Sequence, residues 1–489
     1  MVKIPDQKYC FFDKIINRLQ FLCLYVACTI LFLLLVIGTI SRFLTIMLRL
    51  GMLCSCILFF IASYIEIKLH HRRYPYKLSI LMVAWFLLSQ LIHFANGNIF
   101  HHYTQFLPVY LLAFPFAAIT YDSNRQTGLT TLSMVYISVF LIWVLYTVLL
   151  LHDCVPQFLQ SIIKWDGPRL TIRSHANICA RGFMIGIALS LGFSYKTSRM
   201  WAKFLLWIAA ALMFICLSLT NSRSTILVTG LLIGGIIFFR VYKGGWVQLA
   251  VGIVLVFTIT ISLFHTSQAM FQWNNQRLMN HKSAVQHSAS AEQSSFKVVT
   301  LSANSVSTQA APIDKNDPPG VSFVTVSENT SDSPLIVPDS GSSPQNALAQ
   351  DIFTLNSRTR IWIYALKSIL ENPSILIWGS PTTELSLEEA TVAHTHNSWL
   401  EVLLRMGLPG FVICLIFTWQ AFISSLILLC SHQADLWKKT ISLLVLCILL
   451  SAIFEPSLFF TILSWNYVDF FFFLCLGYML QWTKQLRTR

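Results

Sequence analysis

The stretch GLTTLSMVYISVFLIWVLYTVLLL, residues 128–151, contains no charged side chain. A helix needs about 20 mostly apolar residues to cross a membrane, and this stretch is long enough. Outward from it, stretches of the same kind recur along the chain. They lie at residues 19–40, 43–67, 78–95, 104–121, 175–195, 201–220, 223–241, 246–265, 404–430, 439–457 and 463–482. The sequence therefore predicts an all-α polytopic membrane protein with about 12 transmembrane helices.

The composition and the charge pattern agree with this fold class. The 489 residues are 55% hydrophobic and 11% charged, a balance that a water-soluble chain could not cover with polar surface. Basic residues gather on alternate connections, which the positive-inside rule assigns to the cytoplasm. They include Lys68, Arg72, Arg125, Lys196, Arg199, Arg240, Lys243, Lys438 and Lys439, with further ones at both termini. Both termini are thus expected in the cytoplasm, and anionic membrane lipids explain the net charge of +13 without nucleic acid.

Three regions follow from the pattern of spans. Residues 1–265 hold predicted helices 1–9, residues 404–489 hold helices 10–12, and residues 266–403 form one large loop on the outer, periplasmic side. A shorter outer loop covers residues 152–174. Loops on a rigid scaffold often carry the functional residues, so these two loops are the places to look.

The large loop changes character along its length. Residues 281–350 are rich in Ser, Ala, Gln, Thr and Pro, which predicts disorder. Residues 351–403 are predicted to be helical and catalytic. An apolar pattern at helical spacing runs from Asp351 until Asn372-Pro373 stops it, which indicates an amphipathic helix at the outer membrane surface. Residues 382–391 suggest a second short helix.

Several arginines stand on the outer side of this predicted layout. Arg223 lies in a polar island, Arg358 shares a helix face with Trp362, and Arg360 points elsewhere. A guanidinium group binds phosphate bidentately and keeps its charge, so these residues suit a diphosphate held at the membrane. The alternative is that they contact only lipid headgroups. The same choice applies to Arg169 and Arg173, which precede Asn177 and the sixth span.

His394 and His396, followed by Asn397, carry the best case for acid–base chemistry. Imidazole is the side chain whose unperturbed pKa lies closest to physiological pH. The two histidines could instead bind a metal or act structurally, but no third ligand stands at a familiar spacing. The twelve cysteines also lack zinc spacing, so we expect neither a metal nor a cofactor. Together, arginines and a histidine on one face predict transfer of a group from a lipid diphosphate to a hydroxyl.

Short motifs in this region resemble the signature of the O-antigen ligase and polymerase superfamily. They are SRTRIW (357–362), ENP (371–373), WG (378–379), HTHNSWLE (394–401) and MGLPG (406–410), preceded by TNSRST (220–225). The segment from Arg169 to Asn177 is similar to an arginine and asparagine element of the same superfamily, although the usual Gly and Pro are missing.

The resemblance implies a metal-independent, inverting glycosyltransferase of the GT-C type. Such an enzyme takes a glycan from undecaprenyl diphosphate at the periplasmic face of the bacterial inner membrane. By this resemblance Arg223 and Arg358 would hold the diphosphate, and we expect Arg360 and Arg169 to share in binding it. His394 would be the general base, and His396 is the other histidine that matches the motif.

The resemblance leaves the acceptor open between two kinds of molecule. A ligase uses a sugar hydroxyl of lipid A–core, whereas a polymerase uses a second lipid-linked glycan. One dominant outer loop and a twelve-span layout favour the ligase, and the loop at 152–174 with its arginines keeps the polymerase in consideration. A lipid-oligosaccharide flippase or other transporter is a third hypothesis. Polar residues that gather at one face, and not near the membrane midplane, argue against it.

Overall fold

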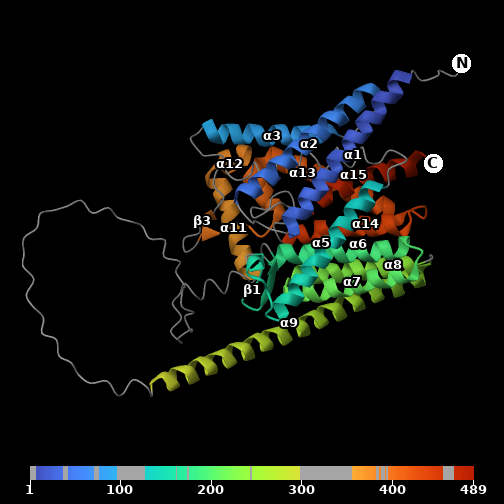
Figure 1. The fold of residues 1–489 in the computed structure, drawn as a ribbon. Coiled ribbons are helices and arrows are strands. Elements are labelled where there is room, and N and C mark those ends of the chain that lie inside the picture. Colours follow the sequence, from blue (N-terminus) through green and yellow to red (C-terminus); the bar gives the residue numbers. More distant parts are fainter. Residues whose placement is uncertain are drawn as a thin grey trace, which may run out of the picture. The chain divides into compact units, whose positions relative to one another are not determined.

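The computed structural model describes most of the chain, and what it describes is mainly helical (Figure 1). The described residues are 7–36, 42–70, 76–95, 127–160, 162–172, 176–242, 245–297, 355–380, 385–386, 391–392, 395–454 and 467–488. The long helices are α1 (Gln7–Val36), α2 (Arg42–His70), α3 (Tyr76–Ala95), α5 (Thr127–Leu151), α6 (Ala176–Lys196), α7 (Met200–Leu219), α8 (Arg223–Val241), α9 (Trp246–Lys297), α11 (Leu355–Glu371), α13 (Ser398–Cys430), α14 (Leu436–Phe454) and α15 (Tyr467–Thr488).

Within the described part of the chain, eight helices contain segments long and apolar enough to cross a membrane. These segments are Arg18–Val36, Leu129–Leu151, Ala176–Lys196, Met200–Leu219, Arg223–Val241, Trp246–His281, Ser398–Cys430 and Leu436–Phe454. The predicted multi-pass membrane protein is thereby confirmed. The predicted span at 104–121 lies outside the described residues, and the predicted spans at 43–67, 78–95 and 463–482 fall on α2, α3 and α15.

The chain divides into two compact units. Unit 1 comprises Met1–Asn275 with Leu355–Arg489, and unit 2 comprises Gln276–Thr354. Helix α9 continues to Lys297, well beyond the predicted end of its span at 265. Residues 281–297 are therefore helical, where the composition predicted disorder, because Ala and Gln are good helix formers and Ser is tolerated in a helix. The rest of the predicted disordered tract lies outside the described residues.

Short strands add to the helices in two places. Strands β1 (Ile163–Asp166) and β2 (Arg169–Ile172) form an antiparallel hairpin in the loop before α6. Strands β3 (Leu385–Ser386) and β4 (Thr391–Val392) pair where a second short helix was predicted. That prediction is wrong. The helix α12 (Pro373–Trp378) occurs earlier, because Pro373 ends the preceding helical pattern and suits the first turn of a new one.

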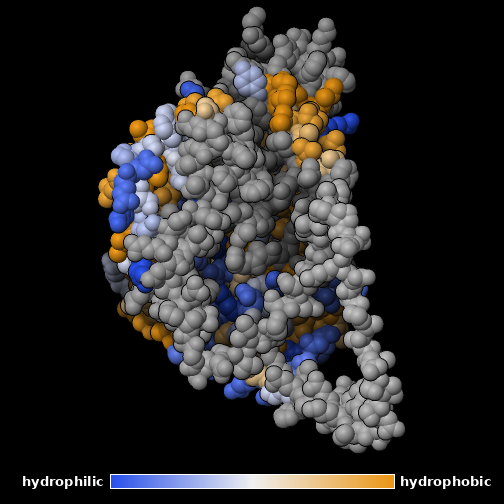
Figure 2. Space-filling view, turned by 90° about the vertical axis from the view of Figure 1, so that its left-hand side faces the viewer, coloured by the Kyte–Doolittle hydropathy of each residue, from blue (hydrophilic) through white to orange (hydrophobic). Residues whose placement is uncertain are grey.

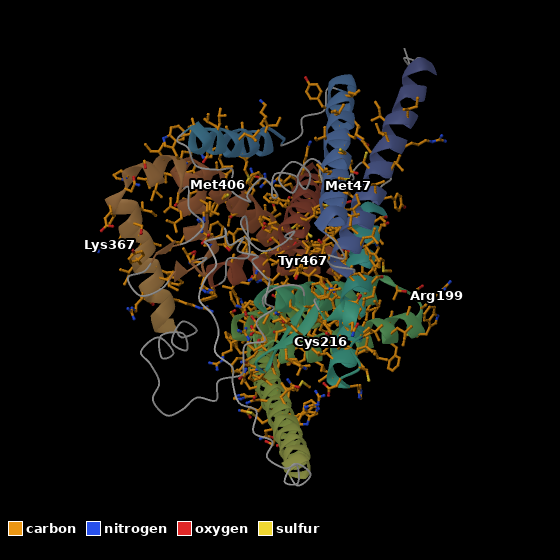
Figure 3. All side chains as sticks on the ribbon, turned by 60° about the vertical axis from the view of Figure 1, so that its left-hand side comes forward. Met47, Arg199, Cys216, Lys367, Met406 and Tyr467 are labelled. Carbon is orange, nitrogen blue, oxygen red and sulfur yellow. The ribbon has the colours of Figure 1, made fainter. Side chains whose placement is uncertain are left out.

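Helices α8 and α14 pack antiparallel, which defines the two ends of the helix bundle in unit 1. Cys447 Sγ donates to Val228 O at 3.7 Å, and a Cβ at Gly235 would lie 2.5 Å from Leu443 Cδ2. Helix α8 therefore begins where α14 ends. We call this end, with the hairpin β1–β2, α11 and α12, the loop end, and the opposite end, with Lys196, Arg199 and Lys438, the basic end. In Figure 3, Lys367 of α11 and Arg199 lie on opposite sides of the molecule.

Aromatic side chains fill the core between α5, α6 and α15. Tyr467 lies in the interior (Figure 3), with its ring 5.9 to 6.4 Å from those of Tyr136, Phe140 and Trp143. Its hydroxyl donates to Ile178 O at 2.5 Å, and its carbonyl accepts from the hydroxyl of Tyr136 at 2.7 Å. Both polar groups of Tyr467 are thus paired, which a buried tyrosine requires.

Two glycines allow the backbone at the end of α12 to lie close to the backbone of α13. Gly379 and Gly407 have positive φ angles of 84° and 64°, a conformation that favours glycine. A Cβ at Gly379 would lie 2.1 Å from Arg405 O, and one at Gly407 would lie 2.3 Å from Ile377 O. Trp85 of α3 donates from Nε1 to Met406 O at 2.9 Å and stacks on Trp378 at 5.5 Å. Both α12 and α3 thus pack against the kink in α13.

We predict that Gly407→Ala destabilises the protein far more than Gly167→Ala. Both positions have positive φ, but a Cβ at Gly167 meets nothing within 4 Å, whereas one at Gly407 meets a backbone carbonyl. Gly167→Ala should cost about 1 kcal/mol from the backbone alone, and Gly407→Ala a further 1–3 kcal/mol. Thermal unfolding in detergent measures both. Equal melting temperatures would show that α12 is not packed against the kink.

Candidate functional site

Arg169 joins the hairpin β1–β2 to the turn between α7 and α8. Its Nε donates to Thr220 O at 3.0 Å, and its Nη2 donates to Asn177 Oδ1 at 2.8 Å. Arg169 is therefore in direct contact with Thr220, in the segment before Arg223, although the two lie far apart in the sequence. Arg169 thus fixes the turn to the hairpin, and its predicted contact with the diphosphate stays a prediction. Arg173 lies outside the described residues.

Arg223 is the first residue of α8 and its side chain is exposed. The turn before it depends on Asn221, which has a φ of 50°, and on a hydrogen bond of 2.9 Å between Ser222 Oγ and Thr225 Oγ1. A cation at a helix N-terminus is unfavourable on its own, because the backbone N–H groups there are also positive. The same arrangement is favourable once an anion is present, since guanidinium and N–H groups then bind it together.

Arg358 and Asn397 both bind the last turn of α14. Arg358 Nη1 donates to Phe454 O, and Asn397 Nδ2 donates to Ile453 O, each at 3.0 Å. The final carbonyls of a helix have no partner within it, so they accept these donors readily. Because α8 begins where α14 ends, Arg358 and Asn397 lie at the same end of the bundle as Arg223. Arg360, on the same helix as Arg358, is exposed.

The loop before α13 is held from three directions through Thr395. Trp362 of α11 donates from Nε1 to Thr395 O at 2.8 Å. The backbone N–H of Thr395 donates to Glu401 Oε2 at 2.9 Å, and its hydroxyl lies within 3.0 Å of both that oxygen and Asn397 O. Asn397 caps α13 by accepting from the N–H groups of Trp399 and Leu400. Every polar group of buried Thr395 is therefore used to fix the loop.

The carboxylate of Glu401 holds Thr395 from inside the bundle, and Arg405 neutralises its charge. The two side chains are 0% and 3% exposed, and Arg405 Nε donates to Glu401 Oε1 at 2.8 Å. A buried carboxylate is tolerated only when it is paired and hydrogen-bonded. One oxygen of Glu401 therefore faces the cation while the other holds Thr395. Sequence reasoning missed both residues, although a Glu and an Arg four positions apart in an apolar helix were a usable signal.

Most of the predicted site residues lie at the loop end of unit 1. Arg169, Asn177, Arg223, Arg358, Trp362 and Asn397 belong to elements that meet there. His396 is half-buried in the same loop, with a φ of 55°. His394 lies outside the described residues, so its predicted role as base stays a prediction. Figure 2 looks at this side of the molecule, where hydrophilic residues are visible near the middle and also along the edges beside hydrophobic ones.

Comparison with known proteins agrees with the motifs. Residues 208–415 match the family model described as O-antigen ligase. The matched range includes Arg223 with α8, Arg358 with α11, and the loop and kink at the start of α13. No curated protein matches the chain significantly.

We predict that Glu401→Gln destabilises the protein by about 3–5 kcal/mol, because Arg405 then loses its carboxylate partner inside the bundle. Glu371→Gln is the matched control. Glu371 pairs with Lys367 at the same spacing, but their side chains are 64% and 62% exposed, so its loss should change stability by about 0.5 kcal/mol or less. Melting temperatures of the two variants in detergent provide the test, and equal shifts would refute a buried anchor at Glu401.

Proposed function

Because the chain belongs to the O-antigen ligase superfamily, we propose that it transfers a glycan from undecaprenyl diphosphate to a sugar hydroxyl of lipid A–core. The reaction would take place on the periplasmic side of the bacterial inner membrane. The observation that carries the proposal is the exposed Arg223 at the start of α8, at the end of the bundle to which hydrogen bonds tie Arg358 and the histidine loop.

The proposed chemistry follows from the charges of these groups. His394 takes the proton from the acceptor hydroxyl, and the oxygen attacks the anomeric carbon from the face opposite the diphosphate. The bond from that carbon to the diphosphate oxygen breaks, and the configuration inverts. Negative charge on the departing diphosphate grows as the bond breaks, and Arg223 and Arg358 stabilise it. His396, next to Thr395, is the alternative base.

The substrates explain why the site lies at one end of a helix bundle. An undecaprenyl chain is as apolar as the lipid tails, so it stays in the membrane while its diphosphate remains at the headgroup level. Arginines at helix termini lie at that level, and their chains reach the phosphates without entering the hydrocarbon layer. The donor glycan can then extend into the periplasm.

A repeat-unit polymerase is the second candidate, and the hairpin β1–β2 favours it. The shorter outer loop is ordered there, and Arg169 connects it to the turn that presents Arg223. A second ordered loop beside Arg223 would offer a surface for a second lipid-linked glycan. The two functions share the donor and differ only in the acceptor.

We predict that Arg223→Ala lowers the transfer rate by about a hundredfold to a thousandfold, because it removes a charge that stabilises the leaving diphosphate. His394→Ala should lower it by at least about a hundredfold, since the proton then has no positioned acceptor. Lys367→Ala, on the exposed face of α11, is the matched control and should stay within about twofold of wild type. The assay follows transfer from a synthetic undecaprenyl-diphosphate glycan.

Arg223→Ala should insert and melt like the wild type, since the Arg223 side chain is exposed, and we expect the same of His394→Ala. Treatment with EDTA should leave the rate unchanged in a metal-independent reaction. A rate that falls in EDTA and recovers with added metal would overturn the proposed mechanism. Full activity of Arg223→Ala would remove this residue from the diphosphate site.

We predict further that lipid A–core is glycosylated in preference to a second lipid-linked glycan when both compete at equal concentration. Product masses distinguish the two outcomes, because ligation adds glycan to lipid A–core and polymerisation lengthens the lipid-linked glycan. Longer lipid-linked products with unmodified lipid A–core would identify a polymerase.

A further inference from the structure

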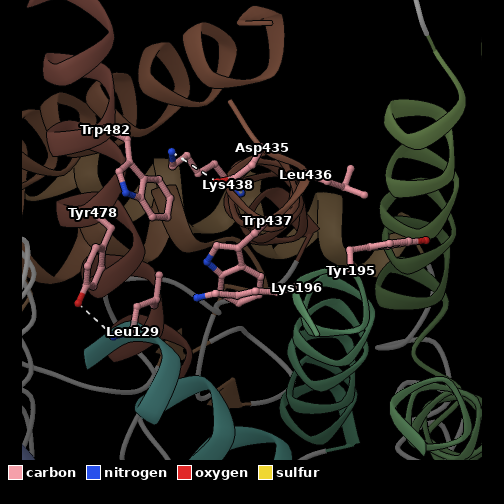
Figure 4. Close-up of a pocket in the computed structure, with 9 residues that line it drawn as sticks. All are labelled: Leu129, Tyr195, Lys196, Asp435, Leu436, Trp437, Lys438, Tyr478 and Trp482. Atoms are coloured by element: carbon pink, nitrogen blue, oxygen red, sulfur yellow. Dashed lines mark hydrogen bonds and ion pairs between the residues drawn. The ribbon is translucent and has the colours of Figure 1, made fainter. Parts of the chain in front are cut away.

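A cavity of about 190 Å³ opens at the basic end of the bundle, far along the helices from the candidate site (Figure 4). It lies between the first turns of α5 and α14 and the last turns of α6 and α15. Leu129 N donates to the hydroxyl of Tyr478 at 3.0 Å, which ties α5 to α15 at its edge. The proposed transfer reaction makes no use of this cavity.

Two ammonium groups and several aromatic rings face this space. Figure 4 shows the nitrogen of Lys196 beside the Trp437 ring and the nitrogen of Lys438 near the Trp482 ring, where it is paired with Asp435. Lys196 Nζ donates to Thr130 Oγ1 at 3.2 Å, and Lys438 Nζ lies 5.9 Å from the centre of the Trp482 ring. Tryptophan and tyrosine are enriched where a membrane protein crosses from hydrocarbon to headgroups. The cavity therefore has an aromatic wall and a cationic opening.

The charge balance at the cavity is positive. Asp435 is the acidic residue of its lining, and its Oδ2 lies 3.5 Å from Lys438 Nζ. The carboxylate side chain is 60% exposed, so this ion pair is weak and a stronger anion can replace it. Arg240, stacked 5.0 Å from the Tyr195 ring, and Lys439, 5.2 Å from the Phe239 ring, add further positive charge at the same end. An anion is thus the ligand that fits.

We propose that this cavity binds the phosphate headgroup of an anionic phospholipid. Lys196 and Lys438 contact the phosphate, while Trp437, Trp482 and Tyr478 pack against the glycerol and the first acyl carbons. A phosphate between helix ends at the membrane surface has an acyl chain in the adjacent hydrocarbon layer, which a free phosphate ion lacks. Basic pockets between transmembrane helices on the cytoplasmic side are suited to such headgroups. The lipid would hold the ends of α5, α6, α14 and α15 together.

The test uses the full chain in detergent, with native mass spectrometry to count retained lipids. Phosphatidylglycerol should remain bound in preference to phosphatidylcholine. Removing each ammonium group should weaken retention roughly fivefold, so the double variant Lys196→Gln/Lys438→Gln should lose it by roughly 25-fold. The double variant Lys164→Gln/Lys367→Gln, at exposed lysines of the loop end, carries the same net charge and should retain the lipid like the wild type.

Competition with inorganic phosphate, and comparison of the two lipids and the two double variants, test the proposal further. Inorganic phosphate at millimolar concentration should not displace the lipid; if it does so completely, the site takes a soluble phosphate and the lipid proposal fails. Equal retention of the two lipids by the wild type overturns the proposal, and so does equal loss in both double variants. If the cavity variant does not fold, the single variants and the wild-type lipid comparison still decide it.

Discussion

The buried carboxylate of Glu401 is the interaction on which the loop end of this protein depends. It takes two donors from Thr395 on one oxygen and the guanidinium of Arg405 on the other. Because Glu401 is buried, each of these hydrogen bonds is worth more than at the surface, and each missing one costs more. The loop that carries the histidine motif is therefore fixed at Thr395, and the proposed base would need such a fixed position to meet a bound hydroxyl.

The same constraint extends to α11 through Trp362 and to α14 through Asn397. Because Arg358 also binds the end of α14, the amphipathic helix is attached at two points of the bundle. Its apolar side chains Ile361, Ala365 and Ile369 are buried, whereas Ile363, Leu366 and Leu370 are exposed. Such a helix can contact both the bundle and the membrane surface.

The basic residues at the two ends of the bundle differ in type and in surroundings. At the loop end, arginines stand at helix termini beside amides and hydroxyls, where a diphosphate can accept several hydrogen bonds at once. At the basic end, lysines dominate and aromatic rings surround them, which suits a membrane headgroup more than a reacting phosphate. Under the two proposals, the basic residues that make up the charge of +13 bind substrate at one end of the bundle and a lipid headgroup at the other.

The sequence by itself determined the multi-pass helical architecture and the group of residues to examine. Lipid leaves backbone groups no solvent partner, so long apolar stretches such as 128–151 must be helical. The alternation of basic connections then predicted which loops share a side. The motifs near Arg223 and from Arg358 to Asn397 also pointed to the family, whose model matches residues 208–415.

Only the tertiary structure decided how these residues are used. Arg169 contacts Asn177 and Thr220, and Arg358 contacts the end of α14, which lies 96 residues away in the sequence. The pairing of β3 with β4 and the continuation of α9 to Lys297 also escaped the sequence patterns. Apolar periodicity records which face of an element is buried. It carries no information about which distant carbonyl or carboxylate accepts a hydrogen bond from a given side chain. Those hydrogen bonds set the geometry of the site.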